Sequence, residues 1–284
     1  MGSPCQIRLK ASSLPHAQAL CAPLIQEAAR FEAKYSRYLP SSLVSQINQS
    51  AGATHRLDAE AAAIIDYAAQ LFVQSDGLFD ITSGLLRKAW DFSSAQLPDA
   101  QAVQALLPSI GWQCVEWQNP ILRLPPTMQI DLGGIVKEYA ADALAQSAME
   151  QGIHTGLIEL GGDIRVFGDA SWPLGISDPL QPNKPLFQLH LQAGGFATSG
   201  NYQRYFMYEG KRYSHILNPK TGWPVVTPAG VSVIADNCLI AGSVSTLALL
   251  MGEDKCLSWL YDLGLPFLCV FNDGRVVNEF VGGG

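Results

Sequence analysis

The segment Asp131-Leu-Gly-Gly-Ile-Val-Lys-Glu-Tyr-Ala-Ala-Asp142 places a pair of glycines where an expected strand, residues 128–131, turns into an expected helix. Apolar and small residues recur at helical spacing after the pair, and Gly152 stands where a helix C-terminal glycine belongs. Glycines at such a turn expose backbone N–H groups at the positive end of the helix dipole, where a phosphate binds well. The segment therefore predicts a phosphate site, although the same glycines would also let a helix pack closely on a sheet. It matches neither G-x-G-x-x-G nor a Walker loop.

His215 is the histidine whose surroundings fit catalysis. It ends an expected strand and precedes Asn218-Pro-Lys-Thr-Gly222, a turn-forming cluster that places it at the rim of a cleft. A histidine there can take a proton from a hydroxyl group near neutral pH, and the alternative is a purely structural histidine. The other four occupy turns, helix ends or the polar face of a strand and are expected to be surface residues: His16, His55, His154 and His190.

Helical patterns dominate the first half of the chain and strand patterns the second, which predicts an α+β architecture. Asp58 is the expected N-cap of one of these helices. Helices are expected over residues 14–34, 58–74, 99–107, 242–251 and 255–263, and residues 35–53 are polar and turn-rich. Strands are expected over residues 5–9, 121–124, 156–160, 163–167, 186–192, 211–217, 230–235 and 267–272.

The composition restricts the class of protein. A chain of 284 residues with 48% hydrophobic and 15% charged residues can bury a substantial core. Its net charge of −7 argues against a nucleic-acid partner. No apolar stretch approaches the roughly 18 residues that span a bilayer.

The six cysteines lie far apart, without the spacing of a metal site or of a redox pair. We expect most of them to be small buried hydrophobic residues, which favours a reducing compartment. They are Cys5, Cys21, Cys114, Cys238, Cys256 and Cys269.

Six short motifs follow one another along the chain. They are Tyr35-Ser-Arg-Tyr38, Phe79-Asp-Ile-Thr-Ser-Gly84, the Asp131 segment, Leu160-Gly-Gly-Asp-Ile-Arg-Val-Phe-Gly168, Ala197-Thr-Ser-Gly-Asn-Tyr202 and Ser214-His-Ile-Leu-Asn-Pro-Lys-Thr-Gly-Trp-Pro224. In this order they resemble the motifs of the ApbE-type FAD:protein FMN transferases, from Met1 to about Gly252. The resemblance implies one flavin transferase domain over residues 1–284, with two lobes forming a compact T-fold-like unit around a nucleotide cleft. The sheet is expected to be mixed or antiparallel, with helices from the first half packed on it.

The resemblance also implies a reaction. An acceptor Thr or Ser hydroxyl attacks the FMN-side phosphorus of FAD and AMP leaves, with His215 as the base and Mg²⁺ at the diphosphate. Lys137, one turn into the helix, is expected to act on the diphosphate as well, although it could be a solvated helix residue. By resemblance, the FAD contacts fall on Met1, Tyr38, Leu78, Phe79, Asp80, Asp131, Lys137 and Ile216. Phe79 and Asp80 could instead be core and cap residues.

The metal site departs from the family pattern. The family has an Asp and a Thr at positions i and i+4 of a helix, together with a backbone carbonyl near the glycine turn. Here the segment reads Ala241-Gly-Ser-Val-Ser-Thr246, so Gly242 replaces the carboxylate. The implied metal residues are therefore Gly134, Gly242, Ser245 and Thr246. Neither Asp163 nor Asp236 has the helical spacing to substitute, and Asn218 in place of the usual Asp is expected to be a turn cap.

Three functions stay open. The chain is a Mg²⁺-dependent transferase acting on a subunit of a flavin-dependent redox complex, an FAD-binding protein with weak or no transfer, or a metal-dependent FAD pyrophosphatase giving FMN and AMP. A redox flavoenzyme is disfavoured because no nicotinamide-binding pattern or redox cysteine pair is present. No signal peptide is recognisable, so we expect a cytoplasmic protein, or an exported one if an N-terminal signal has been removed.

Overall fold

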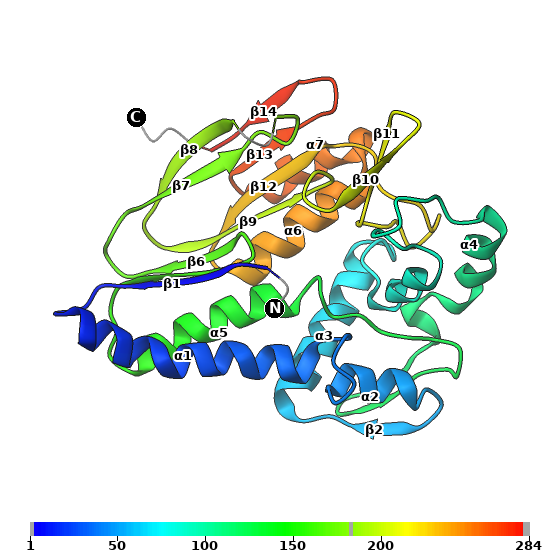
Figure 1. Cartoon of the computed structure of the whole chain (residues 1–284), viewed down its shortest axis with the longest axis horizontal. Coiled ribbons are helices and arrows are strands. Elements are labelled where there is room, and N and C mark those ends of the chain that lie inside the picture. The colour runs from blue at the N-terminus through cyan, green and yellow to red at the C-terminus, as the bar shows by residue number, and fades with distance from the viewer. Residues whose placement is uncertain (1–2, 182–183, 281–284) are drawn as a thin grey trace.

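Seven strands drawn from both halves of the chain form the main sheet of the computed structural model, which describes residues 3–181 and 184–280 (Figure 1). Their order is β1-β5-β6-β9-β12-β13-β14, and every neighbouring pair is antiparallel. The strands are β1 (Cys5–Leu9), β5 (Gly156–Leu160), β6 (Asp163–Phe167), β9 (Gly194–Gly200), β12 (Gly230–Ala235), β13 (Phe267–Val270) and β14 (Val276–Asn278).

Helices cover one face of this sheet. They are α1 (Leu14–Tyr35), α5 (Val136–Glu150), α6 (Cys238–Met251) and α7 (Glu253–Leu263). Helix α5 contacts β5 and β6, α6 contacts β9 and β12, and α1 packs on the outside of α5 (Figure 1). Helix α6 is mostly apolar and almost entirely buried, as expected for a helix surrounded by protein. Contacts with β9, β12, α5 and α7 therefore fix the position of α6.

A hairpin of β7 (Trp172–Ser177) and β8 (Pro185–Leu191) packs on the opposite face of the sheet (Figure 1). Side chains alternate between the two faces, as they must along a strand. In β13, Phe267 belongs to the cluster under the helices, whereas Leu268 belongs to the cluster under the hairpin. The sheet is consequently buried on both faces.

The remaining elements form the second lobe, which extends in Figure 1 from the upper right of the molecule to the region below the main sheet. Its helical elements are α2 (Leu43–Gln49), α3 (Ala59–Gln74), α4 (Ala100–Leu106) and the 3₁₀ segments η1 (Ile81–Lys88), η2 (Leu107–Ser109) and η3 (Trp112–Cys114). Its small sheet has the order β2 (Thr54–Arg56), β4 (Ile121–Arg123), β3 (Glu116–Gln118), and a separate hairpin pairs β10 (Tyr205–Tyr208) with β11 (Lys211–Ser214). No helix of the described chain is long and apolar enough to cross a membrane.

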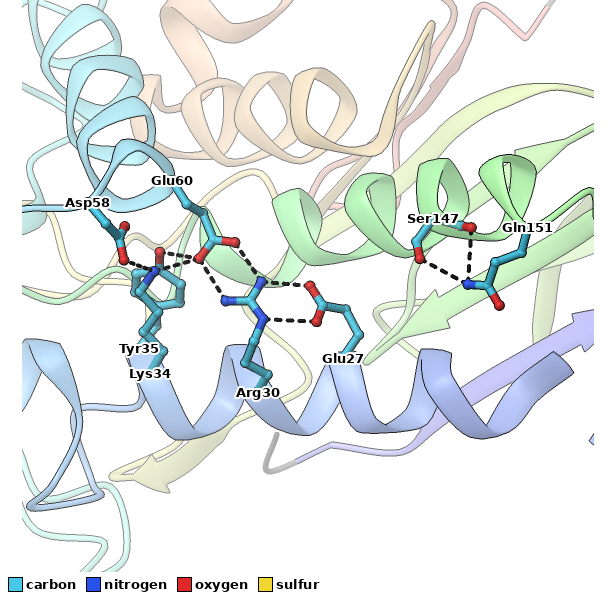
Figure 2. Close-up of polar contacts among 8 residues, drawn as sticks. All are labelled: Glu27, Arg30, Lys34, Tyr35, Asp58, Glu60, Ser147 and Gln151. Carbon is cyan, nitrogen blue, oxygen red and sulfur yellow. Dashed lines mark hydrogen bonds and ion pairs between the residues drawn. The ribbon is translucent and has the colours of Figure 1, made fainter. Parts of the chain in front are cut away.

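A network around Glu60 fastens α1 to the start of α3 (Figure 2). Glu60 Oε2 accepts from Arg30 Nη2 at 2.5 Å, and Oε1 accepts from Lys34 Nζ at 2.9 Å and the Tyr35 hydroxyl at 2.6 Å. Arg30 also binds Glu27 with two hydrogen bonds. Burial raises the pKa of Glu60, but the hydrogen bonds from these three partners outweigh it and lower that pKa from 4.5 to about 2.

Glu60→Gln is expected to lower the free energy of unfolding by about 1 kcal/mol at neutral pH, because solvent screens this half-exposed network. A lowered folded-state pKa means that the contribution of Glu60 is complete above pH 4.5 and lost as the pH falls toward 2. Urea denaturation at pH 6.5 and at pH 3.5 should show a smaller difference between the two proteins at the lower pH. Glu27→Gln, which touches only Arg30 in this network, should cost less, and a pH-independent difference would contradict the assignment.

The structure confirms the α+β prediction and corrects some of its elements. Residues 128–131 are not a strand, because the backbone N–H and carbonyl of Ile130 both bond to the side chain of Asn48 instead of a neighbouring strand. The polar stretch of residues 35–53 contains the helix α2, capped by Ser42. Cys5 and Cys114 are exposed and only Cys238, Cys256 and Cys269 are buried, so the expectation that most cysteines are buried is wrong.

Candidate functional site

The glycine turn before α5 is closed by Asp131. Asp131 Oδ1 accepts from the Gly133 N–H at 2.9 Å, and Oδ2 pairs with Arg37 Nη1 at 3.0 Å. One donor that was expected to face a phosphate is thus already bonded within the protein. The backbone donors of this turn that can serve a ligand therefore begin with Gly134.

Segment η1 and the residues before it pack directly on this turn. A Cβ at Gly84 would lie 2.5 Å from Asp131 Cβ, so only glycine fits there. The ring of Phe79 lies 3.4 Å from the position of a Cβ at Gly134. Phe79 is only 7% exposed and belongs to the main core. The packing of these elements brings the Phe79 and Asp131 motifs together.

Asp80 caps η1 from a buried position. Its Oδ1 accepts from the N–H and the hydroxyl of Thr82 at 2.8 and 2.7 Å, and Oδ2 accepts from the Trp112 N–H at 3.1 Å. Burial raises the pKa of this carboxyl despite these bonds. The geometry is that of a cap, which was one of the two interpretations of Asp80.

His215 lies just beyond β11 and is held by the backbone of Arg204. Its Nδ1 is 3.1 Å from the Arg204 carbonyl oxygen, which can only accept, so Nδ1 carries the proton of the neutral ring. The lone pair of Nε2 is then free to receive a proton. Burial, followed by the positive charges of Arg87 and Arg204, lowers the pKa of His215 to about 4.

The residues after His215 form the predicted turn. Asn218 Oδ1 accepts from the N–H of Lys220 at 2.8 Å, which confirms that Asn218 is a turn cap. Gly222 has a φ of +74°, and its carbonyl accepts from Trp90 Nε1 at 2.8 Å. Of the other histidines, His16, His154 and His190 are exposed, as expected, and His55 is half-buried in β2.

Three arginines surround the same region. Arg37 is bonded to Asp131, and Arg87 is close enough to Asp131, Tyr38 and Arg204 for their charges to act on it. Guanidinium groups match the oxygens of a phosphate, and the ring of Tyr38 is 71% exposed, available to a flat ligand. Only Arg37 lies within one of the six sequence motifs, whereas Arg87 and Arg204 lie outside them, so the three arginines come together only in the folded chain.

Helix α6 brings its polar groups against β9. Ser199 Oγ of β9 lies 2.9 Å from Ser245 Oγ and 2.8 Å from Thr246 Oγ1. Ser245 is completely buried and also donates to the Gly242 carbonyl at 3.0 Å, whereas Thr246 is only partly buried. Of the two hydroxyls, that of Thr246 is the more accessible.

Lys137 lies between two carboxylates. Its ammonium pairs closely with Asp163, which is 4% exposed, and lies 3.4 Å from Glu138 Oε1. Lys137 is therefore not a solvated surface residue. Within residues 3–181 and 184–280, no three His, Cys, Asp or Glu side chains are grouped in a way that could hold a metal ion.

Apolar packing joins the two parts of the site. Leu78 and Ile216 both pack on the cluster that contains Val244 of α6, so the expected FAD contacts lie beside the helix that carries Thr246. Met1, also an expected contact, lies outside the described residues. The structure thus gathers the remaining expected residues around the glycine turn, α6 and the His215 turn.

Comparison with known proteins places this geometry in a family. A family model described as the ApbE family matches residues 1–268. The chain is 31% identical over 264 residues to a FAD:protein FMN transferase of Klebsiella pneumoniae (strain 342), covering 90% of this chain and 81% of that protein. It is 30% identical to the enzyme of the same name from Treponema pallidum (strain Nichols), covering 83% and 72%.

Solved structures of ApbE proteins have the same fold as this chain. The ApbE protein of Thermotoga maritima superposes with a TM-score of 0.91 at 29% identity, covering 98% of this chain and 94% of that one. The apo form of the Pseudomonas stutzeri flavinyl transferase ApbE gives 0.85 at 25% identity, covering 99% and 92%. This chain belongs to the ApbE family.

Proposed function

We propose that this protein transfers FMN from FAD to a Thr or Ser hydroxyl of an acceptor protein and releases AMP, with Mg²⁺ at the diphosphate. The observation that carries the proposal is the contact of His215 Nδ1 with the Arg204 carbonyl, which leaves Nε2 as the proton acceptor of the ring, close to the charges of Arg87 and Arg204. The names of the relatives support the same reaction, since they are FAD:protein FMN transferases. By family, the acceptor is a subunit of a flavin-dependent redox complex.

In the proposed reaction, His215 Nε2 takes the proton of the acceptor hydroxyl. The hydroxyl oxygen forms a bond to the FMN-side phosphorus, and the bond from that phosphorus to the bridging oxygen breaks, so that AMP leaves with the bridging oxygen. Transfer of this kind depends on positioning and on charge neutralisation. Arg37, Arg87 and Arg204 supply fixed positive charge near this point.

The residues present fit a divalent cation. Thr246 offers a hydroxyl oxygen, Gly134 a backbone carbonyl, and Glu138 has a buried carboxylate oxygen to which no described group donates. Such hard oxygen ligands suit Mg²⁺, which would neutralise charge on the diphosphate when bound.

The proposal is tested by incubating the protein with FAD, Mg²⁺ and an acceptor domain, then weighing the acceptor and measuring AMP. A mass gain equal to the FMN group together with AMP is the expected result, and an acceptor with its Thr replaced by Ala should gain nothing. AMP without a mass gain would identify a pyrophosphatase instead. Bound FAD with neither product would identify a binding protein.

A further inference from the structure

The carboxylate of Glu138 lies in the space that a side chain at position 242 would fill. A Cβ built on Gly242 would be 2.5 Å from Glu138 Cγ and 3.1 Å from both Cδ and Oε1. Glu138 reaches this point from α5, whereas Gly242 lies on α6, and the two helices are in contact. A side chain at position 242 would therefore overlap Glu138 where it lies, and the glutamate would have to move to make room for it.

The charge of Glu138 is only partly compensated by its described surroundings. The residue is 5% exposed, and no described group donates to its Oε2. Its Oε1 is 3.4 Å from Lys137 Nζ, but that ammonium has a closer partner in Asp163. Two buried carboxylates share one ammonium, and an unpaired buried charge is costly unless a cation or hydrogen bonds satisfy it.

Other polar groups around Glu138 already have partners. The Tyr67 hydroxyl donates to Ser243 Oγ at 2.9 Å. Asp142, one turn further along α5, accepts from the N–H groups of Cys238 and Leu239 at 2.9 Å and lies 3.5 Å from Arg165 Nε. Asp142 thus caps α6. Glu138, one turn earlier on α5, has an oxygen, Oε2, to which no described group donates. Asp142 therefore stabilises the packing of α5 and α6, whereas Glu138 keeps an oxygen that can bind a ligand.

We propose that Glu138 is the carboxylate ligand of the divalent cation in this protein, reaching from α5 into the volume that an aspartate at position 242 of α6 would occupy. Thr246, one helical turn beyond Gly242, is the hydroxyl ligand on α6. The side chain of glutamate is one methylene longer than that of aspartate, which suits an approach from the neighbouring helix. The inference rests on the proposed function for the presence of the cation and concerns which residue anchors it.

Mn²⁺ binding tests the inference without any acceptor. Free Mn²⁺ is measured by electron paramagnetic resonance during titration of the full chain, with and without FAD. Glu138→Gln keeps the shape of the side chain and removes its charge, and it is expected to weaken Mn²⁺ binding roughly tenfold or more without lowering Tm. Asp142→Asn, on the same face of the helix pair, should lower Tm through loss of the cap but leave Mn²⁺ affinity unchanged.

A second experiment moves the carboxylate from position 138 on α5 to position 242 on α6. Gly242→Asp alone should lower Tm, because its side chain overlaps Glu138, and should not tighten Mn²⁺ binding. Glu138→Ala combined with Gly242→Asp should recover Mn²⁺ affinity to within roughly threefold of the unaltered protein. Recovery supports the proposal, and a folded double variant that still binds weakly overturns it.

Three further results would overturn the inference: no Mn²⁺ binding by the unaltered protein, unchanged binding by Glu138→Gln, or equal losses in Glu138→Gln and Asp142→Asn. The outcome is separable from that of the proposed function. Glu138-dependent Mn²⁺ binding without FMN transfer would keep the inference and reject the function. FMN transfer with Mn²⁺ binding independent of Glu138 would do the reverse.

Discussion

Replacing His215 with alanine is expected to slow FMN transfer by about 100- to 10,000-fold, the range typical for loss of a general base. The neutral ring presents Nε2 as the acceptor because Nδ1 is bonded to the Arg204 carbonyl. FAD affinity should change little, since the proposed role of the ring is toward the acceptor hydroxyl. Single-turnover rates by acceptor mass, alongside FAD binding by fluorescence, separate the two effects. His190→Ala, on the exposed side of β8, is the matched control and should transfer at the normal rate.

The pH profile gives an independent readout of the same residue. Because the pKa of His215 is lowered to about 4, the base is already neutral at pH 6, and kcat/KM should fall only as the pH approaches 4. Arg87→Met removes one of the charges that disfavour protonation, so the acidic limb should move up toward the ordinary value of 6.5. An acidic limb near 6.5 in the unaltered protein, or a normal rate for His215→Ala, would reject the assignment.

Gly195→Ala is expected to destabilise the fold by roughly 3 kcal/mol, at the upper end of overpacking costs. A Cβ at Gly195 of β9 would overlap the Asn237 carbonyl and the Cys238 nitrogen, which are backbone atoms that cannot turn aside. The start of α6 must then move away from β9, together with the cap that Asp142 provides. Since Thr246 lies on this helix, transfer should also fall at temperatures where the variant is still folded.

Differential scanning fluorimetry and urea denaturation measure the loss of stability. The control is Gly175→Ala in β7, where an added Cβ meets nothing within 4 Å and the expected change in Tm is near zero. If both variants melt at the temperature of the unaltered protein, β9 and α6 are not in the close contact described.

The elements that could be predicted from sequence are those with local signals. Helix α3 begins where Asp58 caps it and shows an apolar face. Strand β9 was not predicted, because its sequence of glycines and small residues is dictated by the close approach of α6 and not by strand propensity. The short helix α2 was hidden for a similar reason, since its polar residues are typical of a loop.

The residues of the candidate site also fall into those that local sequence identifies and those that only the folded structure brings together. His215 and the Asn218 turn have a recognisable local chemistry, so both could be selected from the sequence. Glu138 was overlooked although it stands next to Lys137, because its nearness to Gly242 is created only when α5 and α6 pack together. The apparent loss of a carboxylate from one helix could not be matched with a carboxylate on another until both helices were placed.

The shared volume of Glu138 and Gly242 also has an evolutionary consequence. A lineage that gains aspartate at 242 while it keeps glutamate at 138 passes through an overcrowded intermediate, whereas shortening residue 138 first leaves a gap that a later aspartate can fill. The two positions are therefore epistatic, and the order of substitutions is constrained. Among related sequences, a large side chain at one of these positions should accompany a small one at the other.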